Sequence, residues 1–335
     1  MTGSRVTTTV PPAVLVPLSK PAGRALMLGH VHPDADVLGT LLALGDVLAA
    51  RGWVVVEGGP HPAPDLLSFL PGVERYRTLS SVEGPLDVVV LTDCPNPART
   101  EGLIEQARGT GATILNIDHH PDNRRYGDVN WIDTAAAATG EMVYRLVTAL
   151  GVAGITPAVA TNLFTAIHTD TGSFRYSNTT DVTFQIAAAL VAAGARPALV
   201  SSSLYEHRPA DALRWLGESL RRIEVSPDGR VAWLALPSGI VPESFIEAEE
   251  LVNYPRSIGS VRVACFLRQL GADVKVSLRG KGDVDVSRIA ARFGGGGHPN
   301  AAGCTIPGGL PEVTRSVLAA VRDGLDATGL RDARS

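Results

Sequence analysis

Histidines and aspartates gather in four short segments of the sequence, in a pattern that suits metal-dependent chemistry. The segment HVHPDADVLG, from His30 to Gly39, carries two histidines and two aspartates between an apolar run and a helical pattern. Asp93 ends the run LDVVVLTD, a DHH triplet ends ATILNIDHH, and Asp170 lies in HTDTGSFRYSNTT. Grouped carboxylates are costly to desolvate unless they take up protons or face a cation. These segments therefore predict a cation site of the kind found in hydrolases.

Each segment taken alone also has a purely structural explanation. An aspartate before a helical run commonly caps the helix, and Asp36 could do so for VLGTLLAL. Independent caps have no reason to include His30, His119 and His120 as well, so the repetition favours the metal site. Mixed histidine and carboxylate ligands suit Mn²⁺, Fe²⁺ or Zn²⁺ better than Ca²⁺. Five or six such ligands favour two ions, about 3.5–4 Å apart and bridged by a carboxylate.

The elements that must position these groups follow an α/β pattern. Apolar runs at 24–31, 53–58, 86–93 and 112–118 predict strands, and segments near 37–51, 64–69, 100–109 and 138–150 predict helices. Such alternation, with strands that look buried on both faces, is typical of a parallel sheet covered by helices. Parallel sheets bind ligands outside the carboxyl ends of their strands. We therefore expect the polar segments to converge on one crevice.

The second half of the chain predicts a different arrangement. Residues 157–223 are mainly helical in pattern, with segments at 157–167, 183–193, 197–206 and 210–223. Strand patterns follow at 231–237, 260–269 and 273–280, and helical patterns at 287–293 and 311–325. We expect a first domain over 1–199, a linker helix over 200–211 and a smaller mixed α/β domain over 212–335, with a seam at 207–210.

Composition narrows the class of protein. The 335 residues exceed a typical single core, and 45% hydrophobic with 19% charged residues indicates a folded globular chain. A net charge of −4 argues against a protein that coats long nucleic acid. Three scattered cysteines without a CxxC pair support neither disulfides nor a thiolate zinc site. No apolar run approaches the ~18 residues of a membrane span, and prolines interrupt the N-terminal segment, so we expect a cytoplasmic protein without a membrane partner.

Three motifs together carry a family resemblance. HxxPDxDxxG at 30–39, DHH at 118–120 and GGGGHPNAAG at 294–303 resemble the DHH phosphoesterases that carry a DHHA1 domain, over residues 25–305. The chain is most similar to the short stand-alone members, the nanoRNase/pAp phosphatases. The resemblance implies a parallel-sheet DHH domain with flanking helices, joined by a helical linker to a mixed α/β DHHA1 domain.

The resemblance also implies roles for individual side chains. It implies two Mn²⁺ ions, the first held by His30, Asp34 and Asp93 and the second by Asp36, Asp93, His119 and Asp170. His120 then stands beside the scissile phosphate as general acid or hydrogen-bond donor, and Asp118 orients a histidine. His32 stands where many members carry asparagine, and its role stays open.

The distal glycine tract has two interpretations. Composition alone would suit a flexible linker, but the tight frame of helical and small residues favours an ordered turn whose N–H groups form an anion-binding concavity. The tract is neither a P-loop nor a dinucleotide fingerprint. The resemblance implies that this half grips the nucleotide through Arg279, Gly295, Gly296, Gly297 and His298, with Arg175 as a phosphate contact nearer the metals. Lys281 could be a further contact or an exposed charge.

The expected activity is hydrolysis of short RNA or DNA oligonucleotides and of pAp, in a cleft between the two domains of a homodimer. The first alternative is a phosphodiesterase for cyclic di-AMP or the linear dinucleotide pApA. A second is an inorganic pyrophosphatase or polyphosphatase, against which the GGGGHPNAAG motif argues because pyrophosphate has no base to grip. A third is a nucleotide-binding regulator without catalysis, against which the complete ligand set argues.

Overall fold

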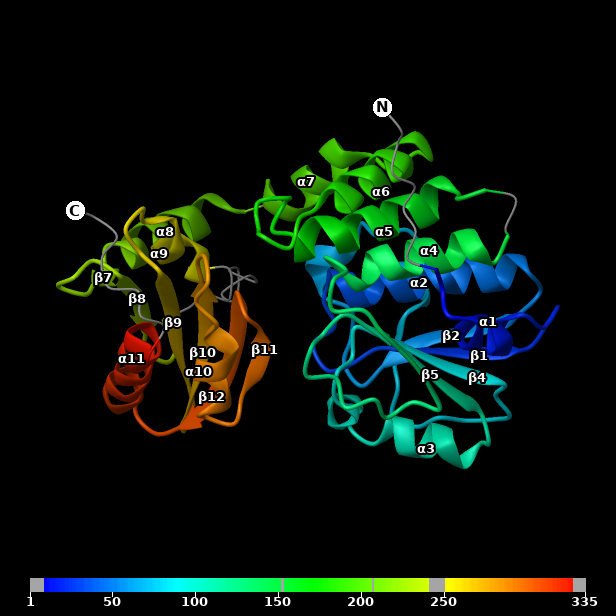
Figure 1. The fold of residues 1–335 in the computed structure, drawn as a ribbon, viewed down its shortest axis with the longest axis horizontal. Helices are drawn as coiled ribbons and strands as arrows, with labels where there is room; N and C mark the ends of the chain where they lie inside the picture. The colour runs from blue at the N-terminus through cyan, green and yellow to red at the C-terminus, as the bar shows by residue number, and fades with distance from the viewer. Residues whose placement is uncertain (1–8, 152–153, 207, 241–250, 328–335) are drawn as a thin grey trace. The chain divides into compact units, whose positions relative to one another are not determined.

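The computed structural model describes residues 9–151, 154–206, 208–240 and 251–327 (Figure 1). The chain divides into two compact units, Met1–His207 and Arg208–Ser335. The division falls inside the segment 200–211, which was expected to form one linker helix. That segment instead contains the end of α7 (Pro197–Tyr205) and the beginning of α8 (Ala210–Leu220). Pro209 explains the interruption, because a proline disfavours helical geometry in the residue before it.

The first unit is built on a six-stranded parallel sheet with the order β3-β2-β1-β4-β5-β6. All of its strand pairs are parallel. The four strands predicted from apolar runs all form. The sheet also contains two short edge strands, which the apolar runs did not predict. The bounds are β1 Arg24–Leu28, β2 Val54–Gly59, β3 Arg77–Thr78, β4 Val88–Thr92, β5 Thr113–Asp118 and β6 Val129–Ile132.

The strand order reverses between β1 and β4. From β1 the chain moves outward through β2 and β3, and then returns to place β4 on the other side of β1. The loops that follow β1 and β4 consequently diverge, which leaves a crevice outside the carboxyl ends of these two strands. His30 follows β1 and Asp93 follows β4, so the topology itself brings these two side chains to the same place.

Helices cover both faces of this sheet (Figure 1). On one face lie α2 (Ala35–Ala50), α4 (Thr139–Ala149) and α5 (Pro157–Asp170), and α3 (Leu103–Gly109) covers the other. Side chains alternate along a strand, so Ala25 and Met27 join the core of α2 whereas Leu26 and Leu28 join that of α3. Burial on both faces is the reason that β1 is apolar from Ala25 to Leu28, whereas Arg24 at its start is exposed.

The remaining elements of the first unit are shorter or lie farther from the sheet. They are α6 (Asp181–Ala192), α1 (Pro12–Leu15) and four 3₁₀ turns, η1 Val16–Leu18, η2 Asp65–Leu67, η3 Val73–Arg75 and η4 Pro97–Thr100. The helix expected near 64–69 is only the turn η2, because Pro64 and Pro71 leave too few residues between them for an α-helix to propagate. Among the described residues, no single helix has the length and composition to cross a bilayer, and α6 with α7, bent by 105°, passes that test only as a pair.

The second unit is a smaller mixed α/β domain, as expected. Its sheet has the order β11-β12-β10-β9-β8-β7, antiparallel except for the parallel pair β8 and β9. One face packs against α10 and α11 and the other against α8 and α9, and Trp215, Tyr254 and Phe293 pack against these cores. The bounds are β7 Glu224–Val225, β8 Val231–Leu236, α9 Asn253–Ser257, β9 Val263–Leu270, β10 Asp273–Gly280, α10 Val286–Ala291, β11 Gly296–His298, β12 Ala301–Pro307 and α11 Leu310–Ala327.

The glycine tract forms an ordered turn followed by an edge strand rather than a flexible linker. The N–H groups of Phe293, Gly294 and Gly295 donate to carbonyls at the end of α10, and the following residues form the edge strand β11. Gly294 has φ 75°, the left-handed conformation that ends many helices. A Cβ on Gly295 would collide with the carbonyl oxygen of Gly303. The glycines therefore let the chain leave a helix and approach β12 closely, and any contact with substrate stays a prediction.

Candidate metal centre

The loops after β1, β4 and β5 gather the predicted histidines and aspartates. Within the first unit, three groups of potential ligand atoms form, and in each group all atoms lie within 4.8 Å of one another. The groups are His30, Asp34 and Asp93; Asp36, Asp93 and His119; and Asp93, Asp118 and His120. Asp170 joins them from the end of α5, with its Oδ2 3.5 Å from His119 Nε2. Asp93 is common to all three groups and is therefore the centre of the arrangement.

His30 offers an unused ring nitrogen to this cluster. Its Nδ1 lies 2.8 Å from the carbonyl oxygen of Val31, which favours the tautomer with hydrogen on Nδ1 and a lone pair on Nε2. That Nε2 is buried and has no hydrogen-bond partner among the described residues. Burial and the neighbouring Arg99 lower the pKa of His30, so the ring stays neutral. A neutral imidazole with an orphaned, buried nitrogen beside carboxylates fits a divalent metal ion.

Asp34 and Asp36 serve two different helices. Asp34 caps α2, because its Oδ1 accepts the N–H groups of Asp36 and Val37 at 3.1 and 3.0 Å. Asp36 is not that cap. Its two oxygens instead accept the N–H groups of Thr139 and Gly140, at 2.7 and 2.9 Å, in the first turn of α4. Burial, followed by the neighbouring Asp93, raises the pKa of Asp36, and a nearby cation would oppose that rise.

Asp93 occupies a strained turn directly after β4. Its φ of 55° is left-handed, which is uncommon outside glycine and recurs at functional sites. Its Oδ1 lies 3.3 Å from His119 Nε2 and 3.4 Å from His120 Nδ1, and accepts a hydrogen bond from the Thr139 hydroxyl at 3.1 Å. Burial raises the pKa of Asp93, but the two imidazoles outweigh it and hold that pKa well below its usual range. Asp93 is therefore an ionised carboxylate on which positive charge converges.

His119 carries the positive charge that these carboxylates demand. Its Nδ1 lies 3.1 Å from the Ala136 carbonyl oxygen, and its Nε2 faces Asp93 and Asp170. Burial lowers the pKa of His119, but Asp170 and Asp93 outweigh it and raise the pKa to about 10. Burial raises the pKa of Asp170 to about 6. A divalent cation would compete with the proton for the same Nε2 lone pair, so the donor set suits a metal ion.

His120 is held in one orientation by its neighbour in the DHH triplet. Its Nδ1 lies 2.8 Å from Oδ1 of Asp118, which is itself fixed by a 2.5 Å hydrogen bond from Asn123 Nδ2 to Oδ2. Burial lowers the pKa of His120, but Asp93 and Asp118 outweigh it and raise the pKa well above its usual value. The ring is therefore an imidazolium held in one orientation.

Three residues of this centre were missed in the sequence. Thr139 lies in a helical pattern that gives no sign of a polar role, although its hydroxyl bonds Asp93. Asn123 follows the DHH triplet by three residues, a spacing that could have marked it. Arg99 lies in the turn η4, with Nη2 3.2 Å from His30 Nδ1. Neither Thr139 nor Arg99 has a local signal, because only the fold brings α4 and η4 to the strand ends.

Two further predicted or noted side chains of the first unit, Arg175 and His32, belong to none of these three groups. Arg175, in the loop after Asp170, donates through Nε to the Gly172 carbonyl at 2.6 Å. His32 is exposed with φ 51° and packs edge-to-face on His61, with ring centroids 4.4 Å apart, so the structure gives it a local partner.

In the second unit, Arg279 lies on β10 and Gly295, Gly296, Gly297 and His298 lie on the approach to β11 and within it. The Arg279 Nε is buried and has no hydrogen-bond partner among the described residues. Lys281 donates to the Ile258 carbonyl at 2.8 Å, so this side chain is not a purely exposed charge.

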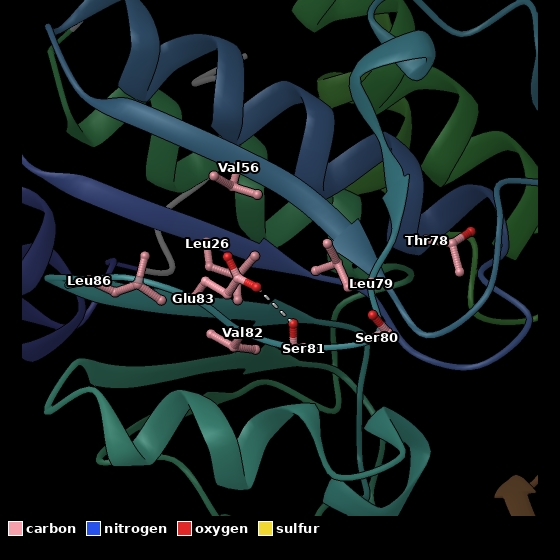
Figure 2. Close-up of a pocket in the computed structure, with 9 residues that line it drawn as sticks. All are labelled: Leu26, Val56, Thr78, Leu79, Ser80, Ser81, Val82, Glu83 and Leu86. Atoms are coloured by element: carbon pink, nitrogen blue, oxygen red, sulfur yellow. Dashed lines mark hydrogen bonds between the residues drawn. The ribbon is translucent and has the colours of Figure 1, made fainter.

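A separate pocket of about 300 Å³ lies away from the ligand groups. Figure 2 shows its lining beside β1 and β2, with Leu26, Val56, Leu79, Val82 and Leu86 supplying apolar walls. Leu26 belongs to the core on the α3 face of the sheet. The polar groups there satisfy each other in part, because Ser81 donates to Glu83 at 3.3 Å. This pocket contains none of the predicted site residues.

Comparison with known proteins agrees with this arrangement. A profile of the DHH family, N-terminal domain, matches residues 24–167, and a profile of the DHHA1 domain matches residues 244–326. The chain is 35% identical to the bifunctional oligoribonuclease and PAP phosphatase NrnA of Thermus thermophilus, over 90% of both chains. It is 29% identical to the protein of the same name from Bacillus subtilis, over 83% of this chain and 87% of the other.

Two further similarities are weaker or purely structural. The cyclic-di-AMP phosphodiesterase PdeA of Listeria monocytogenes is 26% identical over 88% of this chain and 46% of its own. The crystal structure of an exopolyphosphatase-related protein from Bacteroides fragilis superposes with a TM-score of 0.83 at 24% identity, covering 96% of this chain and 97% of the other, which shows the shared fold. From its two domain profiles and its 35% identical relative, this chain belongs to the DHH/DHHA1 family of phosphoesterases.

Proposed function

We propose that this chain is a two-metal phosphohydrolase that degrades short oligoribonucleotides to mononucleotides and removes a phosphate from pAp. The observation that carries the proposal is the position of Asp93, which is common to all three groups of metal-type ligands in the first unit. The names of the relatives that match most of the chain supply the substrate class. Both supports are independent, since one is geometry and the other is sequence similarity.

The cofactor that we propose is a pair of Mn²⁺ ions. His30, Asp34 and Asp93 would hold one ion, and Asp36, Asp93, His119 and Asp170 would hold the other. The ions would supply positive charge to the phosphoryl oxygens and lower the pKa of a water molecule. The orphaned Nε2 of His30 and the carboxylates around His119 support this assignment.

His120 supplies the proton in the mechanism that we propose. A water molecule that has given one proton to solvent forms a bond through its oxygen to phosphorus, and the phosphorus–oxygen bond to the departing group breaks. His120 gives its Nε2 proton to the departing oxygen and later recovers a proton from solvent. The raised pKa of His120 keeps that proton available at neutral pH. Asp118 holds Nδ1 at 2.8 Å and thereby sets the direction of Nε2. Asp93 stabilises the imidazolium before transfer from 3.4 Å.

The substrate contacts in the second unit are part of the same proposal. We assign phosphate or base binding to Arg279, Gly295, Gly296, Gly297 and His298, and a phosphate contact to Arg175. The buried Arg279 Nε without a hydrogen-bond partner among the described residues supports an anionic ligand there. A cytoplasmic location and a homodimeric assembly stay predictions.

A product-resolved digestion tests the function. A labelled RNA length ladder is incubated with the protein and Mn²⁺, beside a reaction with pAp. We expect the shortest oligomers to be consumed first and pAp to release phosphate, with both activities lost on addition of EDTA. The Asp93→Ala variant, checked for folding by circular dichroism, is the control. Equal cleavage of long and short RNA, or no release from pAp, would contradict the proposal.

One alternative is favoured by a specific observation. The relative named cyclic-di-AMP phosphodiesterase aligns with 88% of this chain, so a dinucleotide substrate would use the same metals and fold. Adding cyclic di-AMP and pApA to the same assay separates the two. Faster turnover of the cyclic compound than of short RNA and pAp would replace the main proposal with this one.

A further inference from the structure

Arg99 lies in the crevice between the β1 and β4 loops, where no acidic side chain of the described residues pairs with it. Its carbonyl oxygen accepts the N–H of Val31 at 2.8 Å, which ties the loop after β4 to the loop after β1. Its Nη2 lies 3.2 Å from His30 Nδ1. Within the described residues, no carboxylate oxygen lies within 4.0 Å of its guanidinium nitrogens. Arg75 and Arg145, by contrast, each pair with two carboxylates.

Arg99 and His30 cannot keep this contact when His30 binds a metal ion. A guanidinium only donates hydrogen bonds, so contact with Arg99 requires a lone pair on His30 Nδ1. Coordination through Nε2 requires the opposite tautomer, in which Nδ1 carries hydrogen and donates to the Val31 carbonyl at 2.8 Å. In that state Arg99 has lost its acceptor on the ring. A half-buried guanidinium without an acceptor is unfavourable, so its N–H groups need another partner.

We propose that this partner is a non-bridging oxygen of the scissile phosphate, which makes Arg99 a catalytic residue. The inference rests on the proposed phosphohydrolase function and deepens it. The planar fork of arginine matches the spacing of phosphate oxygens. Negative charge grows on these oxygens as the water attacks, so the contact strengthens in the transition state. Arg99 exchanges no proton and forms no covalent bond in this role.

The position of Arg99 favours contact with the reacting phosphate over contact with another phosphate of the substrate. His30, which Arg99 touches, belongs to the same ligand group as Asp93. An oxygen within reach of the Arg99 guanidinium therefore lies beside the ligand groups. The residues assigned to remote parts of the substrate, such as Arg279, lie in the second unit.

Charge and geometry are separated by two substitutions and one control. Arg99→Gln removes the charge, Arg99→Lys keeps the charge without the fork, and Arg77→Gln alters an exposed arginine on the edge strand β3. The substrates are pAp and bis(p-nitrophenyl) phosphate, which has a single phosphorus atom. We expect Arg99→Gln to lower kcat/KM about 100-fold on both substrates, within the range of a charge-assisted hydrogen bond. We expect the kcat/KM of Arg99→Lys to lie between those of the parent and of Arg99→Gln, and that of Arg77→Gln to stay within about twofold of the parent.

Metal binding supplies the readout that is independent of turnover. Free Mn²⁺ is titrated by electron paramagnetic resonance in the parent and in Arg99→Gln, and thermal unfolding is measured in EDTA. We expect Mn²⁺ affinity and melting temperature to stay close to those of the parent. A loss of Mn²⁺ affinity that parallels the loss of activity would overturn the proposal, because Arg99 would then only position His30.

Two other outcomes separate this inference from the proposed function. If the parent is active and Arg99→Gln is equally active, the role given to Arg99 is wrong and the proposed function stands. A loss confined to pAp, with normal cleavage of bis(p-nitrophenyl) phosphate, also overturns it, because Arg99 would then serve a remote phosphate. A parent that hydrolyses none of the phosphoesters while binding Mn²⁺ removes the function itself.

Discussion

The hydroxyl of Thr139 donates to Oδ1 of Asp93 across 3.1 Å, and both residues are buried. The bond ties the first residue of α4 to the turn after β4. The N–H of the same Thr139 donates to Asp36 Oδ2 at 2.7 Å. One residue therefore orients two of the carboxylates assigned to the metals, although it offers no ligand itself.

Thr139→Val should weaken metal binding without unfolding the protein. Valine keeps the shape and the N–H bond to Asp36 but loses the hydroxyl that orients Asp93. Removing such a supporting hydrogen bond typically weakens metal affinity about 10- to 100-fold. Mn²⁺ titration by electron paramagnetic resonance measures the change, and Thr139→Ser, which keeps the hydroxyl, is the control. Equal affinities in the two variants would contradict the role given to the hydroxyl.

Two substitutions at Asp93 should separate its charge from its backbone conformation. Asparagine tolerates the left-handed φ of 55°, whereas alanine does so at a cost of roughly 1–2 kcal/mol. Both variants lose the charge, and we expect at least a 100-fold loss of kcat with loss of Mn²⁺ binding. Urea unfolding in EDTA should show Asp93→Ala to be less stable than Asp93→Asn. Retained turnover in Asp93→Asn would remove Asp93 from the proposed mechanism.

Asp36→Ala should destabilise the metal-free protein by about 1–2 kcal/mol, because the first turn of α4 loses both acceptors of its N–H groups. Asp36→Asn keeps one acceptor oxygen, so this variant should lose less stability than Asp36→Ala. Urea unfolding in EDTA at pH 7 measures both. If the two variants unfold at the same urea concentration as the parent, the bonds to α4 contribute nothing to stability.

The metal-free protein should lose stability as the pH rises from neutrality. The pKa of His119 is raised to about 10 in the fold, against an ordinary value of 6.5. A raised pKa contributes stability that is complete below pH 6.5 and is lost as the pH rises through about 10. The urea midpoint in EDTA should therefore fall between pH 7 and 10, and less steeply in His119→Asn. Mn²⁺ affinity should rise over the same range, since the ion displaces that proton. A parent curve as flat as that of the variant would refute the assignment.

Gly295→Ala should destabilise the protein by about 1–3 kcal/mol. Its Cβ would collide with the Gly303 carbonyl and with Cys304, both in the neighbouring strand β12. Gly217 on α8 has nothing within 4 Å of the corresponding position, so Gly217→Ala should be neutral or stabilising. Differential scanning calorimetry of both variants without substrate makes the comparison. An unchanged Gly295→Ala would mean that the tract is not required for the packing of β11 on β12.

The fold could be predicted where each element has its own apolar pattern. Strands β1 and β4 are buried on both faces from Ala25 to Leu28 and from Val88 to Leu91, so each contains a continuous apolar run. The edge strands β3 and β6 were not predicted, because two to four residues carry no period. Strand β12 could not be predicted from the sequence for another reason. Its alanines and glycines become a strand only through pairing with β10, a contact that local sequence does not specify.

The sequence by itself determined which residue types stand at the strand ends, and a parallel sheet then brings them to one edge because all its carboxyl ends point the same way. Only the tertiary structure decided which partner each side chain takes. Asp36 bonds α4 rather than its own helix, Thr139 bonds Asp93, and Arg99 meets His30, across 104, 46 and 69 residues of chain. A hydrogen bond depends on distances of a few tenths of an ångström and on angles. Those follow from how α2, α4 and η4 pack on the sheet, which no local pattern of residues encodes.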